Sequence, residues 1–302
     1  MNRRPLAALL TAALLLCLCG CAQWPPAPPE EPTPEPPLPT VTLEPAPSHM
    51  PETALRVYYD GMLADRGYVR DGTVFLDPAP LCAELELEES NVADVKGFTL
   101  QAGSLAVTGE RGKDYFCAGE RYLFAPEGWM VVDGRAYLSA EVLSRIFGAN
   151  ISATKDLSRV DVSTRGARLM DGSDALYHSL CSDEEIFWLT HIISAEAGTQ
   201  PLAGQIGVGN VIFNRVADPY YPDKVLDVIF QKGERAQFDP VDDGSINRGS
   251  FQLSLIAVYL CLEGYNTVGQ SEFFVNPDTG NAAWFEANRT FVVRIGDHEF
   301  YA

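Results

Sequence analysis

The chain has 302 residues, 46% of them hydrophobic, which is enough for a packed core in one large domain or two modest ones. Acidic residues outnumber basic ones by 41 to 22, and the formal net charge is -19. This charge repels phosphate backbones and anionic lipid, so the composition argues against a nucleic-acid-binding protein.

The first 20 residues predict an export signal. Two arginines precede an apolar stretch over residues 6–18, which is shorter than the about 20 residues of a membrane-spanning helix. The stretch ends in "LCGC", which resembles the lipobox of bacterial lipoproteins and implies that Cys21 becomes a lipidated N-terminus. Ordinary secretion, with cleavage near Cys19 or Gly20, is the alternative. We expect an extracytoplasmic protein, anchored by lipid to the outer face of the cell membrane or to the spore inner membrane.

Residues 21–51 are predicted to form a linker behind the lipidated cysteine. Residues 22–51 hold 12 of the chain's 21 prolines, with glutamates between them. Such a segment favours polyproline II and spans on the order of 90 Å at about 3.1 Å per residue. We interpret it as a stalk, and a ligand for a proline-binding module is the weaker alternative.

Residues 52–165 read as short strands separated by turn signals. Two segments, 71–88 and 133–151, repeat one pattern of a glycine turn, a strand and an amphipathic helix. The region resembles the stalk-type domain named after the N-terminal region of copper amine oxidases. No cluster of His, Cys or carboxylate residues in this segment suggests a metal site, so we interpret the region as a small strand-rich accessory domain that acts as a spacer or binding module, with an accessory protein as a candidate partner. Residues 166–181 are predicted to be a linker.

Four cysteines remain outside the export signal and the lipidation site. Export permits disulfides, and the domain boundaries favour pairing Cys82 with Cys117 and Cys181 with Cys261. Four buried free thiols are an equally good expectation.

Residues 182–302 are predicted to form the domain that carries the chemistry. Ser182 and Glu185 have the spacing of a capping box at a helix start. Apolar residues then recur at helical spacing, at Ile186, Leu189, Ile192 and Ile193. Glu196 continues this series three residues after Ile193, so it is expected on the buried stripe of the helix.

The helix is expected to end at Gly198, with Thr199 capping the next helix and Pro201 in its first turn. The second helix carries Gly204, Gly207 and Gly209, which predict a close approach by another backbone.

A carboxylate on an apolar face is penalised when charged, so the pKa of Glu196 is expected to rise. A raised pKa suits a general acid that protonates a glycosidic oxygen. The alternative is a glutamate that turns outward at the helix end or pairs with Arg215 or Arg235.

Four ordered blocks strengthen the catalytic interpretation. They are "SAEAGTQPLAGQIGVGNVIFNRV", "YPDKVLDVIFQKGERAQFDPVDDGSI", "FFVNPDTGNAAW" and "VVRIGDHEFYA". Together they resemble the catalytic domain of spore cortex-lytic enzymes, the SleB-type cell-wall hydrolases. The run "QKGERAQF" departs from the family pattern, which puts the shape of that loop in doubt.

The resemblance implies a lysozyme-like, mostly helical domain with a small terminal β-hairpin, in a chain that is α+β as a whole. It also implies a lytic transglycosylase that cuts peptidoglycan strands between MurNAc and GlcNAc, with Glu196 in the position of the catalytic acid. Such an enzyme needs one carboxylate, whereas an inverting hydrolase needs a second one about 6.5–9.5 Å away. Asp239, Asp242 and Asp243 are candidates for that second acid, or line a solvated loop.

Further residues are candidates for binding the glycan. Polar or aromatic side chains in the matching blocks are expected to line the cleft, although each has a structural alternative: Gln205, Gln237, Phe238, Phe274, Asn276, Trp284 and His298. Gln205 is alternatively an exposed helix position, and His298 a structural residue in a terminal hairpin with a Gly-Asp turn.

Other site classes are not supported by the sequence. His178, His191 and His298 do not form the spacing of a zinc amidase, and the glycines of the second helix follow no strand. Cys261 lies in an apolar helix, which is unlike a nucleophile. We therefore expect no cofactor and no metal, and peptidoglycan glycan strands as the partner. A surface module that binds glycan without cutting it is the alternative from another class.

Overall fold

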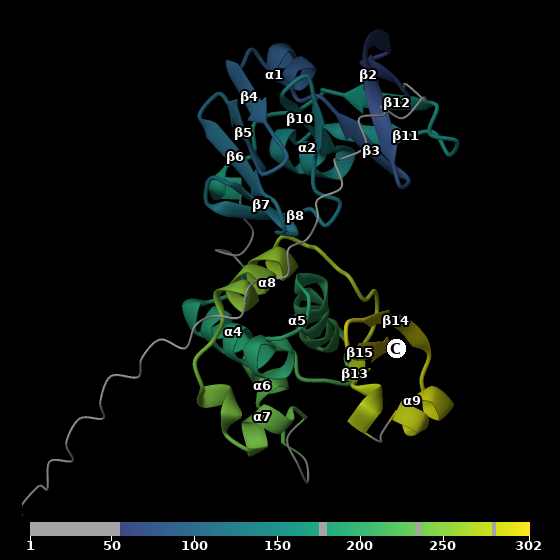
Figure 1. Cartoon of the computed structure of the whole chain (residues 1–302). Coiled ribbons are helices and arrows are strands. Elements are labelled where there is room, and N and C mark those ends of the chain that lie inside the picture. Colours follow the sequence, from purple (N-terminus) through teal and green to yellow (C-terminus); the bar gives the residue numbers. More distant parts are fainter. Residues whose placement is uncertain (1–54, 175–179, 233–236, 280–281) are drawn as a thin grey trace, which may run out of the picture. The chain divides into compact units, whose positions relative to one another are not determined.

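The computed structural model describes residues 55–174, 180–232, 237–279 and 282–302. Several predicted features lie outside the described residues: the signal peptide, Cys21, the proline-rich stalk, His178 and Arg235. Residues 233–236 of the run "QKGERAQF" also lie outside them. The described chain contains both helices and sheets, and the predicted α+β class is confirmed (Figure 1). No described helix is both long and apolar enough to cross a membrane.

A seven-stranded sheet opens the described chain. Its strand order is β11-β12-β1-β2-β3-β10-β9. The strands are β1 (Leu55–Tyr59), β2 (Met62–Arg70), β3 (Thr73–Leu76), β9 (Met130–Val132), β10 (Arg135–Ser139), β11 (Asn150–Ala153) and β12 (Arg159–Ser163). Strands β1 and β12 pair in parallel, so the first and last strands of this region lie side by side, and the other pairs are antiparallel.

Asp-Gly pairs make the tight turns of this sheet. At Asp71–Gly72 and Asp133–Gly134 both residues have positive φ, from 50° to 80°, as two-residue hairpin turns require. Each turn leads into a strand and then a helix, α1 (Ala79–Glu84) or α2 (Ala140–Phe147). The repeated turn, strand and helix predicted from the sequence is therefore confirmed, and its two strands, β3 and β10, pair with each other.

A second sheet is an antiparallel meander of five consecutive strands. They are β4 (Glu89–Ala93), β5 (Gly97–Ala102), β6 (Leu105–Glu110), β7 (Tyr115–Ala118) and β8 (Arg121–Phe124). Alternate side chains of these strands point into the core, as expected for sheets with one buried face. The buried core of this region runs from Leu55 to Val162 and includes the apolar face of α2.

The C-terminal region is mostly helical. Its α-helices are α4 (Asp183–Ala197), α5 (Leu202–Ala217), α6 (Val225–Ile229), α7 (Asp239–Asp242), α8 (Gln252–Leu262) and α9 (Ala282–Asn288). Short 3-10 turns are η1 (Gly172–Asp174), η2 (Ser245–Asn247) and η3 (Pro277–Thr279). The strands β13 (Phe273–Val275), β14 (Phe291–Ile295) and β15 (His298–Tyr301) form a sheet in the order β13-β15-β14 beside α5 (Figure 1). The predicted terminal hairpin is confirmed, with Gly296 at a φ of 58° in its turn.

Helices α4, α5 and α8 enclose the second core. Helix α8 is apolar on all sides, and buried residues spread along it from Ser254 to Leu262. The glycines of α5 allow close packing, as predicted, but the approaching atoms belong to side chains. A Cβ at Gly207 would lie 2.8 Å from the Phe300 ring, and one at Gly209 would lie 2.7 Å from Cys261 Sγ.

A buried ion pair joins β8 to the end of α8 within the compact unit Met50–Ala302. Arg121 donates to both carboxylate oxygens of Glu263, at 3.1 and 2.7 Å, and both side chains are at most 5% exposed. The Arg145 guanidinium lies 3.7 Å from the centre of the Tyr265 ring. Loss of one partner of such a pair leaves a buried charge uncompensated.

The predicted disulfide pairs are not present. All four of the cysteines outside the N-terminal region are free thiols, as the alternative expected, although only Cys82 and Cys261 are buried. Cys261 Sγ lies 3.3 Å from the Ile206 carbonyl oxygen inside the helical core, and burial raises the pKa of this thiol. Cys117 and Cys181 are only partly buried.

Candidate active site

Helix α4 places Glu196 at the end of an apolar stripe. The predicted capping box is present, because Ser182 Oγ accepts from Glu185 N and the Glu185 carboxylate accepts from Ser182 N. Leu189, Ile192 and Ile193 are fully buried, and Glu196 follows them on the same stripe, partly buried. The prediction of a carboxylate among apolar side chains is confirmed.

Helix α4 ends at Ala197, and the position that follows has no room for a side chain. A Cβ at Gly198 would lie 2.4 Å from the Ser194 carbonyl oxygen and 2.7 Å from the Phe251 ring. Its φ of -60° is ordinary, so glycine is required here by close contact and not by a left-handed conformation. The expected cap at Thr199 is wrong, since α5 starts at Leu202 with Pro201 at its N-cap and no side-chain cap bond.

Burial, as the largest cause, and the nearby charges of Asp239 and Asp243 together raise the pKa of Glu196 from 4.5 to about 7. The positive charge of Arg215 opposes this rise. A pKa near neutrality leaves a large fraction of the carboxyl protonated at physiological pH, as a general acid requires. Glu196 is thus the titratable group that the geometry of this region favours for acid catalysis.

The acidic segment after Phe238 carries the two negative charges that raise the pKa of Glu196. Asp239 begins the short helix α7, and Asp243 follows its end. Asp243 Oδ1 accepts from Ser245 N at 2.7 Å, and hydrogen bonds from Ser245 lower the pKa of Asp243. Asp243 therefore stays ionised next to an acid that resists ionisation, an arrangement that separates the protonation states of two carboxyl groups.

Arg215 is the cation of the site. It is 4% exposed on α5, and its Nε donates to the Glu272 carbonyl oxygen at 2.8 Å. Its guanidinium carbon lies 5.2 Å from the centre of the Phe238 ring, and Nη1 is buried without a hydrogen-bond partner in the described part of the chain. The sequence suggested Arg215 only as an ion-pair partner of Glu196, and the structure assigns it an influence on the pKa of that acid.

A row of aromatic side chains extends from Arg215 across the C-terminal sheet. The rings of Phe238 and Phe274 are 6.4 Å apart, and those of Phe274 and His298 are 5.3 Å apart. Phe238 and His298 are buried, at 2% and 7% exposure, and Phe274 is partly buried. Burial lowers the pKa of His298. The row brings three predicted binding residues together, although it presents little of Phe238 and His298 to a ligand.

Gln205 is not the exposed helix residue that one interpretation expected. Its side chain is fully buried, Nε2 donates to the Gln200 carbonyl oxygen at 3.0 Å, and Oε1 accepts from Ser254 Oγ at 2.8 Å. Contact with a substrate would require this burial to be relieved. The helix α5 is buried on several sides, which a count of residues across the preceding turn does not reveal.

The three other predicted binding residues lie at different places. Gln237 is exposed, and its backbone N–H donates to the Gln231 carbonyl oxygen at 3.2 Å. Asn276 Oδ1 accepts from Asp278 N at 2.9 Å in the turn after β13. Trp284 is 54% exposed on α9 and packs edge-on against Phe285. Their predicted contacts with glycan stay predictions.

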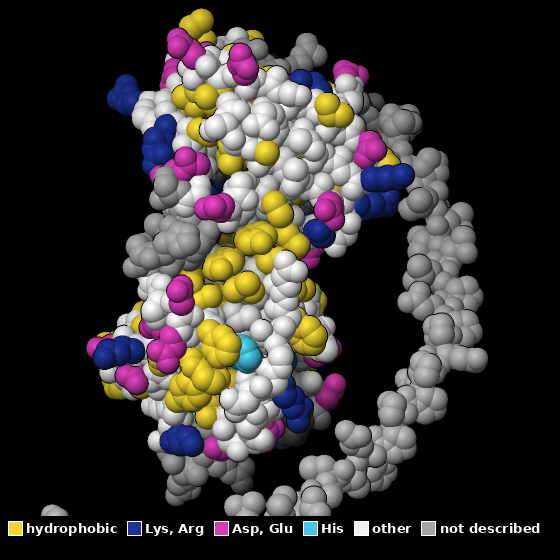
Figure 2. Space-filling view, turned by 90° about the vertical axis from the view of Figure 1, so that its left-hand side faces the viewer, with side chains coloured by type: hydrophobic (Ala, Val, Ile, Leu, Met, Phe, Trp, Pro, Cys, Tyr) yellow, Lys and Arg dark blue, Asp and Glu magenta, His cyan; other side chains and the backbone are white. Residues whose placement is uncertain are grey.

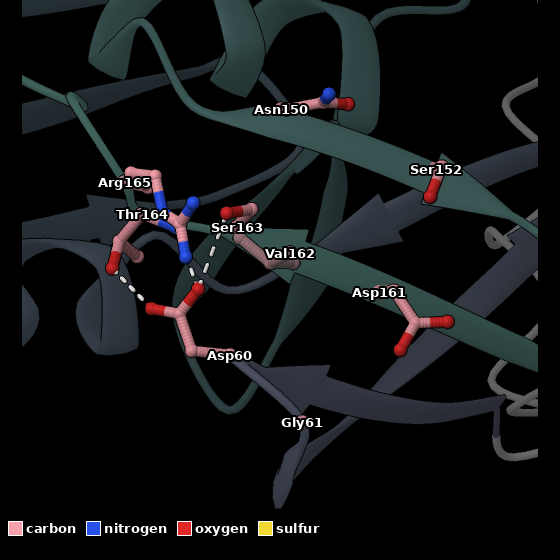
Figure 3. A pocket seen from close by; sticks show the side chains of 9 residues that line it. All are labelled: Asp60, Gly61, Asn150, Ser152, Asp161, Val162, Ser163, Thr164 and Arg165. Carbon is pink, nitrogen blue, oxygen red and sulfur yellow. Dashed lines mark hydrogen bonds between the residues drawn. The ribbon is translucent and has the colours of Figure 1, made fainter.

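Two further features are separate from the carboxyl group of Glu196. A shallow cavity of about 570 Å³ lies over the seven-stranded sheet and is lined by polar residues around Asp60, whose carboxylate is already bound by Ser163 and Thr164 (Figure 3). Aromatic rings of Phe187, Trp188 and His191 pack together on α4, and Phe187 is nine residues from Glu196, on the opposite side of the helix. Figure 2 shows a histidine beside hydrophobic side chains on one face.

In the part of the chain that the structure describes, no group of three or more His, Cys, Asp or Glu side chains is placed to hold a metal ion.

Residues 199–301 match the Cell Wall Hydrolase family, and this match begins three residues after Glu196. A spore cortex-lytic enzyme of Halalkalibacterium halodurans is 35% identical over 119 residues, which are 39% of this chain and 35% of the relative. One of Bacillus subtilis is 31% identical over 134 residues, 44% of this chain and 43% of the relative. The chain spans less than half the length of either relative.

Among solved structures, the chain is similar to the catalytic domain of the germination-specific lytic transglycosylase SleB from Bacillus anthracis. It is 29% identical, and the match covers 41% of this chain and 98% of that domain, with a TM-score of 0.38. The predicted resemblance of the C-terminal region to spore cortex-lytic catalytic domains is confirmed by these sequence matches. The family match lies outside residues 52–165, so the stalk-type resemblance of that region stays a prediction.

Proposed function

We propose that this protein cleaves the glycan strands of peptidoglycan at the MurNAc–GlcNAc bond, as a lytic transglycosylase of spore cortex or cell wall. One observation carries the proposal. The partly buried carboxyl of Glu196 has a pKa raised to about 7 at the C-terminal end of α4. The similarity of the surrounding sequence to cell wall hydrolases supplies the substrate class. A lysozyme-like arrangement of the domain belongs to the same proposal.

The reaction needs one group that first gives and then takes a proton. Protonated Glu196 donates its proton to the glycosidic oxygen, and the bond between that oxygen and C1 of MurNAc breaks. The resulting Glu196 carboxylate accepts the proton of the MurNAc C6 hydroxyl, whose oxygen bonds to C1. The products are a free GlcNAc hydroxyl and a 1,6-anhydro end, and no water is consumed. Burial favours the protonated acid at the start of this cycle.

Hydrolysis is the second candidate, because Asp239 and Asp243 lie near enough to Glu196 to raise its pKa. One of these carboxylates would activate water on the opposite face of the sugar in an inverting mechanism. The released end would then be a reducing sugar.

Mass spectrometry of fragments released from purified peptidoglycan tests both candidates. Anhydro ends from the wild-type protein, with none from Glu196→Gln, are expected. Reducing ends that depend on Glu196 would replace the transglycosylase by the hydrolase. Equal release of fragments by wild type and Glu196→Gln would exclude Glu196 as the acid, and binding without release by either form would leave only a glycan-binding module.

The location of the protein is a separate part of the proposal. The signal-like N-terminus and "LCGC" favour a lipid anchor at Cys21, with the proline-rich segment as a spacer between membrane and enzyme. Metabolic labelling with a fatty acid should mark the full chain and not Cys21→Ser. Labelling that survives this substitution would contradict the anchor.

A further inference from the structure

The loop between α4 and α5 is held by a side chain that reaches across 97 residues of sequence. Gln200 Oε1 accepts from the backbone N–H of Asp297 at 2.9 Å, and Gln200 Nε2 donates to Asp297 Oδ2 at 3.1 Å. Both ends of one amide are thus bound to one residue in the turn between β14 and β15. We call these two bonds the Gln200–Asp297 clamp.

Gly296 lets the hairpin turn lie directly on the loop. A Cβ at this position would come within 2.4 Å of Gln200 Oε1 and 2.9 Å of Pro201 Cδ. Its φ of 58° is also a conformation that favours glycine. The backbone of the turn therefore packs directly against the side chains of Gln200 and Pro201, and little free space remains around the Gln200–Asp297 clamp.

The same loop is held from inside the helical core. Gln205 Nε2 donates to the Gln200 carbonyl oxygen, and Gln205 Oε1 accepts from Ser254 Oγ on α8. Gln205 and Ser254 are fully buried. The backbone of Gln200 is consequently held by Gln205 of α5, which is itself bonded to α8, and its side chain is held by the C-terminal hairpin.

Glu196 lies four residues before Gln200, in the last turn of α4. The loop adds one bond of its own to that turn, from Gln200 N to the Ala197 carbonyl oxygen at 2.9 Å. Movement of the loop would therefore move the end of the helix that carries the acid. A misplacement of about 1 Å can lower catalysis by about 100-fold, whereas a hydrogen bond at an exposed site contributes only about 1 kcal/mol to stability.

We propose that Gln200 and Asp297 are positioning residues that hold the acid-bearing end of α4 in place for the glycan cleavage proposed above, on which this inference rests. Neither residue needs to touch the substrate. Their bond links the catalytic acid to the last strand pair of the chain, so the C-terminal hairpin is part of the catalytic apparatus.

The test uses full-length protein and compares kcat, KM and thermal unfolding. Gln200→Ala and Asp297→Ala should each lower kcat at least 10-fold, with KM changed less than 3-fold and little change in Tm. Gln200→Glu should be at least as impaired as Gln200→Ala, because it places a carboxylate against Asp297. Combining Gln200→Glu with Asp297→Asn restores a donor and an acceptor in reversed order, and should recover most of kcat.

Thr154→Ala is the matched control. Thr154 Oγ1 also makes two hydrogen bonds across an exposed turn, to the backbone of Arg159 in the N-terminal sheet. This variant should keep wild-type kcat. A kcat for Gln200→Ala within twofold of wild type, or no recovery in the combined variant, overturns the positioning role.

A second readout does not depend on turnover. Loosening the loop admits water to the Glu196 carboxyl, so its pKa, followed by NMR titration, should fall toward the ordinary value in Gln200→Ala. An unchanged pKa of Glu196 in this variant also counts against the clamp. The proposed function fails separately, if wild-type protein shows no cleavage that Glu196→Gln abolishes.

Discussion

Ser194 Oγ accepts a hydrogen bond from the backbone N–H of Phe251 at 2.9 Å, which ties the start of α8 to the last turn of α4. Ser194 is 8% exposed and lies two residues before Glu196. The Phe251 ring in turn covers Gly198, just after the helix. The position of the acid therefore depends on α8 as well as on its own helix.

Ser194→Ala should destabilise the protein by about 1–3 kcal/mol, because the Phe251 N–H loses its acceptor in a partly buried place. Chemical denaturation measures this loss. Ser163→Ala is the control, since it removes a hydroxyl from an exposed hydrogen bond to Asp60 and should change stability by less than about 0.5 kcal/mol. Equal effects of the two changes would contradict the role assigned to Ser194.

The pH dependence of cleavage should follow the protonated form of Glu196. Its pKa of about 7 predicts that kcat falls as pH rises through neutrality, since the general acid then loses its proton. Initial rates on purified peptidoglycan between pH 5 and 9 measure this fall in kcat. A rate that stays constant up to pH 9 would mean that another group supplies the proton.

Removal of one acidic neighbour of Glu196 should shift the pH at which kcat falls. Asp243→Asn keeps an oxygen to accept from Ser245 N but removes a charge that raises the pKa of Glu196, so the fall in rate should begin at lower pH. Asp242→Asn is the matched control. It also removes one negative charge from α7, but Asp242 is not one of the two acids, Asp239 and Asp243, that raise the pKa of Glu196. Complete loss of activity in Asp243→Asn or Asp239→Asn at every pH would instead favour the hydrolase.

The position of Glu196 could be predicted because helical spacing is a local property. Leu189, Ile192 and Ile193 define a buried stripe, and a residue three positions further on lies on it whatever the rest of the chain does. The capping box at Ser182 is local in the same way. These features needed no knowledge of tertiary structure.

The supports of the acid could not be predicted, because they join distant segments. Nothing in the sequence near Gln200 indicates that its amide binds Asp297, although the hairpin turn that contains Asp297 was predicted. Gln205 was a candidate for binding substrate because it follows Glu196 across one turn, with an exposed helix position as the alternative, whereas α5 is buried on several sides. The predicted disulfide pairing was wrong for a similar reason. An even number of cysteines and their assignment to domains do not set the distances between the thiols.

Replacement of the acid should stabilise the protein above neutral pH. The folded pKa of Glu196 is raised from 4.5 to about 7, so the folded state binds this proton more tightly than the unfolded state does. At pH 4 the carboxyl is largely protonated in both states and contributes little. As pH rises from 4.5 to 7 the unfolded state loses the proton first, and the folded state becomes less stable by up to about 3 kcal/mol, since one pKa unit corresponds to about 1.4 kcal/mol. Glu196→Gln removes this penalty.

The free energy of unfolding of Glu196→Gln should therefore match wild type at pH 4 and exceed it by up to about 3 kcal/mol at pH 8, while cleavage is lost. Denaturation curves at the two pH values measure the difference, with Glu184→Gln on the exposed side of α4 as the control that should show none. A difference that is equal at both pH values would show that Glu196 ionises as it does in an unfolded chain, and the acid role would then have no physical basis.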